Sequence, residues 1–318
     1  MKYIYSWLIA AGLLFSAQAM AEPTNRVFVT NEKSNTVTVI NGKTLEVEAE
    51  IKVGERPRGI GLSPDRTELY IALGEEDAIE VIDPKTLEIL RRFDSGSDPE
   101  TFAVHPNGNL YISNEDAGLA TAFNPKTGEK IVEIQVGLEP EGVAISPDGK
   151  KVVVTSESSN MLHVISVPEH QIIANILVGA RPRDATFTQD GKIAYATSEI
   201  SGEVKKIDME KHEIIKVVEL EGKSAKPKDV RLTPDEKKLY VAGGRSNSVY
   251  SLNPETMDVL KSIPVGKRVW GLAISSDGKH VFTTDGVDNQ VSVIDTEKDE
   301  VIKSIKVGEM PWGVVIDD

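Results

Sequence analysis

The last ten residues of the chain, Glu309 to Asp318, read E-M-P-W-G-V-V-I-D-D. They predict a turn and one short apolar strand that has no partner nearby in the sequence. The same pattern opens longer segments at 55–62, 138–145 and 180–187. The sequence R-V-F-V-T-N from Arg26 to Asn31 matches the second strand of such a segment but lacks a first strand. We therefore predict that the two chain ends complete one unit and close a ring, which leaves no unpaired sheet edge between them.

The repeat has a period of about 42 residues, which is typical of four-stranded propeller blades. Turn sequences such as Ser146-Pro-Asp-Gly149 and Asn124-Pro-Lys-Thr127 separate runs of β-branched and aromatic residues. The units end at seven glycines: Gly54, Gly96, Gly137, Gly179, Gly222, Gly266 and Gly308. The sequence predicts an all-β, seven-bladed β-propeller, closed by pairing of Gly313–Ile316 with Arg26–Thr30. The extra residues around 219–226 are interpreted as a loop insertion.

The N-terminus has the pattern of a secretory signal. Lys2 precedes a largely apolar run from Ile4 to Phe15, and Ala19-Met20-Ala21 forms an A-x-A cleavage site. The apolar run is short for a membrane span, so we favour a cleaved signal peptide (1–21) over a retained anchor. The expected mature protein is a single propeller domain (22–318) in the periplasm, without a membrane span.

Composition excludes several classes of function. The chain has no cysteine, so disulfides, thiolate metal sites and covalently attached c-type haem are excluded. Its formal net charge of −14 disfavours general binding to nucleic acid or anionic membranes. A site for an anion would therefore require a local cluster of basic residues on this acidic protein.

The second-strand motifs, including Val27-Phe-Val-Thr-Asn31, resemble the signature of the YVTN-type β-propeller repeat family. The inter-blade motifs Arg56-Pro-Arg-Gly-Ile60, Ala180-Arg-Pro-Arg183 and Pro311-Trp-Gly-Val-Val315 are similar to one subfamily, the periplasmic propellers associated with catabolism dependent on pyrroloquinoline quinone (PQQ). The resemblance covers essentially all of the mature chain. It implies a role beside quinoprotein alcohol oxidation but no known reaction, because propellers have many functions.

The residues on either side of the inter-blade proline are predicted to lie at the mouth of the central channel. After the proline these are Arg58, Glu100, Glu141, Arg183, Lys228, Trp270 and Trp312; before it, Arg56, Asp98, Glu139, Arg181, Lys226, Arg268 and Met310. Seven bases and four acids give these positions a positive balance. Arginine and tryptophan beside a concavity suit a planar or carboxylated ligand. The predicted ligand-binding residues are Arg56, Arg58, Arg181, Arg183, Lys228, Arg268, Trp270 and Trp312.

An alternative is that these side chains form a structural plug. Glu32, Glu115, Glu157 and Glu199 are predicted in loops on the same face and could pair with the arginines. A ligand site at the surface implies that replacing Arg183 hardly changes stability, whereas the ion-pair alternative implies no effect on ligand binding.

Signals for catalysis are weak. The five histidines occupy different positions in their units, so no metal ring is predicted, and no hydrolase or metalloprotease motif is present. No catalytic residue or metal ligand is assigned. The favoured function is a non-enzymatic binding or accessory protein linked to PQQ-dependent alcohol oxidation. Its expected partner is a small anionic molecule, for which PQQ is a candidate, or a periplasmic protein such as a quinoprotein dehydrogenase system. The alternatives are a lactonase-like hydrolase and a catalytic quinoprotein.

Overall fold

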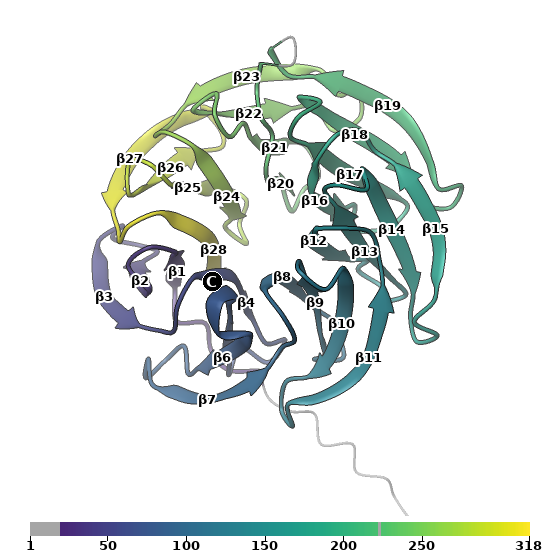
Figure 1. Cartoon of the computed structure of the whole chain (residues 1–318). Helices are drawn as coiled ribbons and strands as arrows, with labels where there is room; N and C mark the ends of the chain where they lie inside the picture. Colours follow the sequence, from purple (N-terminus) through teal and green to yellow (C-terminus); the bar gives the residue numbers. More distant parts are fainter. Residues whose placement is uncertain (1–19, 222–223) are drawn as a thin grey trace, which may run out of the picture.

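The computed structural model describes residues 20–221 and 224–318 and shows seven four-stranded antiparallel sheets arranged in a ring around a channel (Figure 1). The predicted seven-bladed propeller is confirmed. The described residues include one short 3₁₀ helix, η1 (Gly74–Glu76), and otherwise strands and turns. Residues 1–19 of the predicted signal peptide and Gly222 lie outside the described residues, and the cleavage prediction stays a prediction.

The strands of each blade follow one another from the channel outward, and blade 1 takes its innermost strand from the C-terminal part of the chain. Blade 1 is β28 (Pro311–Asp317), β1 (Arg26–Asn31), β2 (Thr36–Asn41) and β3 (Val47–Lys52); blade 2 is β4 (Pro57–Leu62), β5 (Leu69–Leu73), β6 (Ala78–Ile82) and β7 (Ile89–Asp94). Blade 3 is β8 (Pro99–Val104), β9 (Leu110–Asn114), β10 (Leu119–Asn124) and β11 (Glu129–Gln135); blade 4 is β12 (Pro140–Ile145), β13 (Lys151–Ser156), β14 (Met161–Ser166) and β15 (Ile172–Leu177). Blade 5 is β16 (Pro182–Phe187), β17 (Ile193–Ser198), β18 (Glu203–Asp208) and β19 (Glu213–Glu219). Blade 6 is β20 (Val230–Leu232), β21 (Leu239–Ala242), β22 (Ser248–Leu252) and β23 (Val259–Pro264); blade 7 is β24 (Val269–Ile274), β25 (His280–Asp285), β26 (Gln290–Asp295) and β27 (Glu300–Lys306).

The burial of each strand follows its place in the blade. The second and third strands are packed on both faces by neighbouring blades, and β5 and β6 are buried at every residue. The outer strands are largely exposed, as in β7, where exposed and partly buried residues alternate. The core is therefore divided into clusters between blades, each built from apolar side chains of two adjacent sheets.

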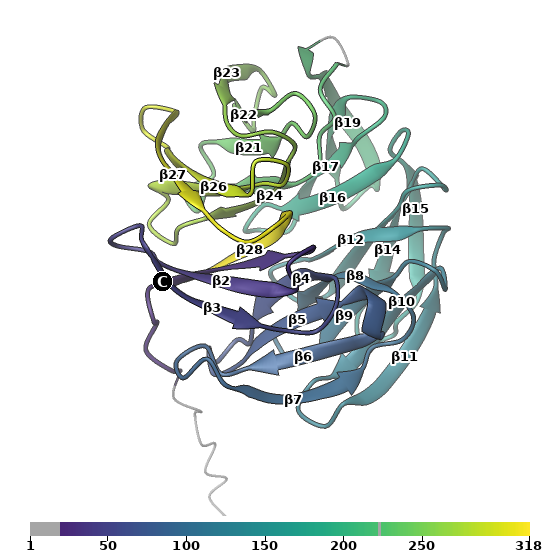
Figure 2. The same cartoon turned by 60° about the vertical axis from the view of Figure 1, so that its left-hand side comes forward.

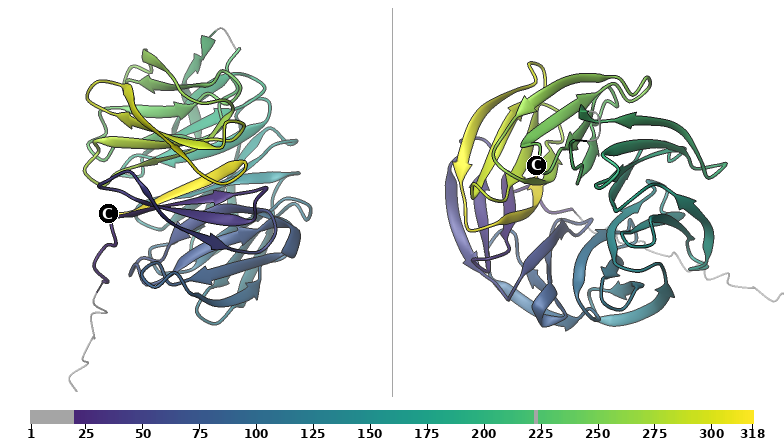
Figure 3. Two further views of the ribbon diagram at one scale, coloured as in Figure 1. Left: turned by 90° about the vertical axis from the view of Figure 1, so that its left-hand side faces the viewer. Right: turned by 45° about the horizontal axis from the view of Figure 1, so that its top comes forward.

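The C-terminal strand closes the ring as predicted. Strand β28 is antiparallel to β1, with Val27 opposite Ile316 and Phe28 opposite Val315. Figures 2 and 3 show this last strand, in yellow, against the purple N-terminal strands. Buried Asp317 accepts hydrogen bonds from the backbone N–H and hydroxyl of Thr24, at 2.8 and 2.6 Å, and from Arg66 of blade 2 at 3.0 Å. The segments before β1 and at the end of β28 are therefore fastened to each other.

A repeated hydrogen bond joins the inner part of one blade to the next. A hydroxyl at the end of the second strand donates to the backbone carbonyl of the residue that follows the inter-blade proline, or its equivalent, in the next blade. The five pairs are Thr30 to Arg58, Ser113 to Glu141, Thr155 to Arg183, Thr197 to Lys228 and Thr284 to Trp312. Blades 2 and 6 have Ala72 and Ala242 at this position, so two junctions lack the hydroxyl. The threonine of the repeat motif thus has a direct structural role.

Blade 6 departs from the others at its inner strand. Strand β20 has three residues, whereas the inner strands of the other blades have six or seven. The predicted insertion lies a few residues before this strand, and two of its described apolar residues, Leu220 and Ala225, are buried. Within residues 20–221 and 224–318, no helix has the length and apolar character needed to cross a membrane.

Candidate functional site at the channel mouth

The inter-blade loops turn sharply before they enter the inner strands. At six of these loops the residue before the inner strand has a positive φ, between 44° and 59°. These residues are Arg56, Asp98, Glu139, Arg181, Arg268 and Met310. The left-handed turn directs the chain into the channel wall, so the residue after the proline lies beside the channel. The sequence prediction of a ring of side chains at the mouth agrees with this geometry.

The bases of blade 2 pair with acids of blades 1 and 3. Arg56 contacts Asp98 and lies 2.6 Å from Glu100, while Arg58 contacts Glu100 and lies 3.5 Å from Glu32. Glu100 is fully buried. Arg58 lowers the pKa of Glu100, although burial acts in the opposite direction. These two arginines are therefore committed to neighbouring carboxylates.

A second ion-pair group spans blades 4 to 6. Arg183 contacts Glu157 and lies 2.5 Å from Glu141, and only 7% of its side chain is exposed. Lys228 lies 2.6 Å from Glu199, and Arg181 lies 2.5 Å from Glu157. Burial and the nearby Arg183 lower the pKa of Lys228 to about 7, against the opposing effect of Glu199.

These contacts change the predicted charge of the mouth. The loop acids Glu32, Glu115, Glu157 and Glu199 join the four acids of the two ring positions, so eight acids face seven bases. The positive balance expected from the ring positions alone is wrong once the loops are counted. The expectation that Arg183 can be replaced at little cost is also at odds with its burial among three carboxylates. The sequence showed these glutamates, but spacing alone could not show how closely they approach the arginines.

Trp270 and Trp312 form the aromatic part of the mouth. Their rings stack with centroids 6.5 Å apart. Three cations surround Trp270: Lys228 at 4.3 Å, Arg268 at 4.8 Å and Arg183 at 5.7 Å from the ring centroid. Among the described residues no carboxylate forms an ion pair with Arg268, and its Nε atom has no hydrogen-bond partner. Arg268 is thus the mouth base that has a tryptophan contact but no acidic partner in the described chain.

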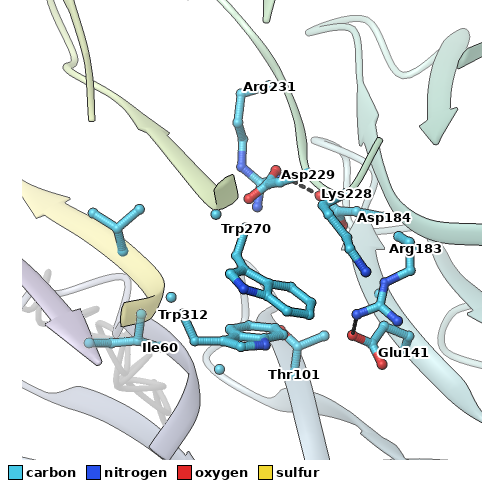
Figure 4. Close-up of a pocket in the computed structure, with 15 residues that line it drawn as sticks. Ile60, Thr101, Glu141, Arg183, Asp184, Lys228, Asp229, Arg231, Trp270 and Trp312 are labelled. Carbon is cyan, nitrogen blue, oxygen red and sulfur yellow. Dashed lines mark hydrogen bonds and ion pairs between the residues drawn. The ribbon is translucent and has the colours of Figure 1, made fainter. Parts of the chain in front are cut away.

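A cavity of about 90 Å³ lies in the channel, and its lining includes Trp270, Trp312 and Lys228 (Figure 4). Figure 4 shows Trp270 and Trp312 stacked on one side, with Arg231, Asp229, Lys228, Arg183 and Glu141 around the other sides. Sequence reasoning missed Asp184, Asp229 and Arg231, which also line this cavity. The sequence could have identified Asp184 and Asp229 through the residue two positions after the inter-blade proline, or its equivalent. This position is Gly59, Thr101, Gly142, Asp184, Asp229, Gly271 and Gly313, so two adjacent blades alone carry an acid there.

The glycines at this position have a packing function. A Cβ atom at Gly142 would lie 2.3 Å from the carbonyl oxygen of Arg183, and one at Gly313 would lie 2.5 Å from that of Arg58. Inner strands of neighbouring blades therefore approach closely where glycine is present. Asp184 and Asp229 are exceptions to this close approach and project carboxylates instead.

A three-acid group, Asp98, Glu100 and Glu115, has ligand atoms within 4.8 Å of one another. Arg56 and Arg58 already neutralise Asp98 and Glu100, so we assign no metal to this group. Burial, together with the hydrogen bond to Glu100, raises the pKa of Glu115 to about 8. The protonated form of Glu115 is therefore favoured beside Glu100.

The histidines are separated in the structure. The rings of His105 and His170 each lie 5.9 Å from that of Tyr111, and His163 hydrogen-bonds to Asn175 in blade 4. His212 and His280 belong to blades 5 and 7. His105 and His170 thus share one neighbour, whereas His163, His212 and His280 belong to three different blades.

Comparison with known proteins agrees with this architecture. Residues 7–119 match the family model described as YNCE-like beta-propeller, and residues 170–302 match the one described as lactonase, 7-bladed beta-propeller. The chain is a seven-bladed β-propeller that resembles both families. A curated relative, the uncharacterized protein YncE of Salmonella typhimurium, is 28% identical over 90 residues. The match covers 28% of this chain and 25% of the length of YncE.

Solved structures share the propeller fold at low sequence identity. The hydrazine synthase of Kuenenia stuttgartiensis has a TM-score of 0.78 and 20% identity, covering 87% of this chain and 94% of that chain. A candidate 6-phosphogluconolactonase from Bacteroides uniformis has a TM-score of 0.77 and 20% identity, covering 92% and 99%. At this identity the likeness shows the fold of the propeller alone.

Proposed function

We propose that this protein is an exported propeller that binds a small planar anion at the channel mouth, as an accessory to PQQ-dependent alcohol oxidation. The observation that carries the proposal is Arg268 beside Trp270, with a guanidinium that has no carboxylate partner among the described residues. An aromatic ring and an unpaired guanidinium together suit the flat face and the carboxylate of one ligand.

The ion pairs at the mouth indicate which base is available to the carboxylate of a ligand. Arg56, Arg58, Arg181, Arg183 and Lys228 already have acidic partners, so an incoming carboxylate would compete with glutamates for them. Arg268 is free of this competition within the described chain. Periplasmic location and the link to PQQ are supported by the N-terminal pattern and by the resemblance of the inter-blade motifs.

Intrinsic fluorescence tests the proposal, because Trp270 and Trp312 are the tryptophans of the expected mature chain. PQQ, a planar aromatic monocarboxylate such as nicotinate, and succinate are titrated into the mature protein, with correction for ligand absorbance. Saturable quenching is expected with at least one planar anion. Arg268→Ala should weaken binding about ten- to a hundred-fold, because a charged hydrogen bond contributes about 1.5–3 kcal/mol.

Arg245→Ala is the matched control, since Arg245 is an exposed base in the 243–248 loop of blade 6 outside both the cavity and the tryptophan contacts. Its affinity should equal that of wild type. Flat titrations for all three ligands at low salt, or equal weakening in both variants, would reject the mouth as a ligand site.

A lactonase-like hydrolase is the second candidate function. The lactonase family match over residues 170–302 includes the inner strands of blades 5, 6 and 7, which supply Asp184, Asp229 and Trp270 to the cavity. The candidate 6-phosphogluconolactonases among the structural neighbours also favour testing it. Proton release from lactones in weakly buffered solution, measured with a pH indicator, tests this activity directly.

A further inference from the structure

The cavity contains a pair of carboxylates that share one guanidinium. Arg231 Nη1 donates to Asp184 Oδ2 at 2.7 Å and lies 3.0 Å from Asp229 Oδ1. Asp229 Oδ2 accepts a hydrogen bond from the backbone N–H of Leu272, in the next blade, at 2.9 Å. Asp229 Oδ1 is buried and accepts no hydrogen bond within the described chain. Asp229 is thus held at Oδ2 by a backbone N–H and lies at Oδ1 against the Arg231 guanidinium, beside the cavity.

The two carboxylates are suited to different roles. Burial raises the pKa of Asp229 well above its ordinary value, against the effect of Arg231, and the nearby Asp184 adds to the rise. Burial and the neighbouring carboxylate thus both favour the protonated form of Asp229. Asp229 is therefore suited to donate a proton, while Asp184, which accepts a hydrogen bond from Arg231, is suited to accept one.

The rest of the cavity can orient a substrate. Lys228 and Arg183 line it on the side of the pair, and Trp270 and Trp312 form the apolar wall. The small volume favours a compact molecule. An anionic group on this molecule would be held by Lys228 and Arg183 in competition with their partners Glu199 and Glu141. Arg231 keeps 38% of its side chain accessible, so the pair is open to water from the channel.

We propose that Asp184 and Asp229 are the catalytic residues of an acyl hydrolase site for a small carboxylic ester, cyclic or open-chain, that carries an anionic substituent. This inference rests on the second candidate function and names the residues that would perform it. It is independent of ligand binding at Arg268.

The reaction balances with water as the co-reactant. Asp184 removes a proton from water as the water oxygen bonds to the acyl carbon, and the carbonyl electron pair moves onto oxygen beside Arg231. The carbonyl then re-forms and the ester carbon–oxygen bond breaks. Asp229 gives its proton to the departing alkoxide, and the proton on Asp184 passes to Asp229. The product acid ionises into solvent, which releases one proton for each ester hydrolysed.

The experiment measures proton release from 5-oxotetrahydrofuran-2-carboxylate, a γ-lactone with a carboxylate, and from γ-butyrolactone, which lacks the carboxylate. Wild type should hydrolyse the carboxylate-bearing lactone faster. Asp184→Asn and Asp229→Asn should each lower kcat at least about a hundred-fold, the usual contribution of general acid–base catalysis. Asp190→Asn, at an exposed turn of blade 5, is the matched control and should retain the wild-type rate.

A pH profile separates catalysis from a structural effect. Wild-type kcat should fall at high pH as Asp229 loses its proton, and Asp229→Asn should remove this alkaline limb from the residual rate. Thermal melting of each variant shows whether it folds, and the wild-type profile tests the proposal even if one variant does not. Hydrolysis that survives both asparagine variants would overturn the assignment but leave a lactonase function in place. A wild type inert toward both lactones would overturn the assignment and the lactonase function together.

Discussion

The hydroxyl of Thr30 in blade 1 donates a hydrogen bond of 2.7 Å to the backbone carbonyl of Arg58 in blade 2. The residue whose carbonyl is held in this way is the one whose side chain lies beside the channel. Thr155 and Thr197 hold Arg183 and Lys228 in the same manner. One contact of the repeat therefore joins adjacent blades and also fixes the positions of the mouth side chains.

Replacing Thr30 by valine should destabilise the protein by about 1–3 kcal/mol, because the carbonyl of Arg58 would lose this buried donor. Urea unfolding monitored by circular dichroism measures the change. Thr44→Val, at an exposed turn, should stay within about 0.5 kcal/mol of wild type. Equal midpoints for Thr30→Val and wild type would show that the inter-blade bond contributes little.

Arg183→Met should be strongly destabilising, by about 3–5 kcal/mol, because it leaves buried Glu141 without its ion-pair partner and removes one of the two arginines that contact buried Glu157. Arg245→Met provides an exposed comparison on the same face and should be nearly neutral. Chemical unfolding of both variants is the measurement. A loss below about 1 kcal/mol for Arg183→Met would mean that the glutamates become protonated or solvated at little cost.

Deletion of residues 309–318 should abolish cooperative unfolding or cause aggregation. The deletion removes strand β28, exposes the edge of β1 and takes away Val314, Val315 and Ile316, where each fully buried apolar side chain contributes about 1.5–3 kcal/mol. Thermal melting with light scattering measures both outcomes. An unchanged melting temperature in a monodisperse truncated protein would contradict closure by β28.

The Glu115 carboxyl should make stability depend on pH. Its folded-state pKa of about 8 exceeds the ordinary value of 4.5, so the folded state retains a proton that the unfolded state releases. The contribution of this group is complete below about pH 4.5 and is lost as the pH rises through 8. The free energy of unfolding of Glu115→Gln, relative to wild type, should therefore increase between about pH 5 and 8.5. Parallel urea midpoints for the two proteins over this range would exclude the effect.

The mature protein should begin at Glu22 if the Ala19-Met20-Ala21 motif is cleaved. N-terminal sequencing of protein from a periplasmic extract tests this, with Ala19→Leu as a variant that should slow processing. A chain that retains Met1 in the membrane fraction would support the anchor alternative instead.

The sequence predicted the fold well because each blade repeats the same local signals. The apolar run that ends at Ile316 and the strand that begins at Arg26 predicted how the two chain ends pair. The regularly spaced glycines and Asx-Pro turns predicted the number of blades. The chemistry of the mouth was less predictable, since Glu157 and Arg183 come from different blades and their contact depends on the ring geometry. Asp229 was missed because several other blades have glycine at the same position. The reason for those glycines, the close approach of neighbouring inner strands, is seen only in the structure.

The alanines at positions 72 and 242 have a consequence for how the ring could move. They interrupt the threonine contacts at two junctions, between blades 2 and 3 and between blades 6 and 7, and so divide the ring into two arcs. Carboxylates bridge these seams instead: Glu100 with Arg58 at one, and Asp229 with the N–H of Leu272 at the other. The tryptophans and Ile60 belong to one arc, whereas Arg183, Lys228 and Asp229 belong to the other. A rotation of one arc relative to the other at these two junctions would separate the tryptophans from the charged residues of the cavity without disrupting any blade. Apolar side chains still pack across both junctions, but the polar contact there is made by a carboxylate instead of a hydroxyl, so it responds to pH in a way that the threonine contacts do not.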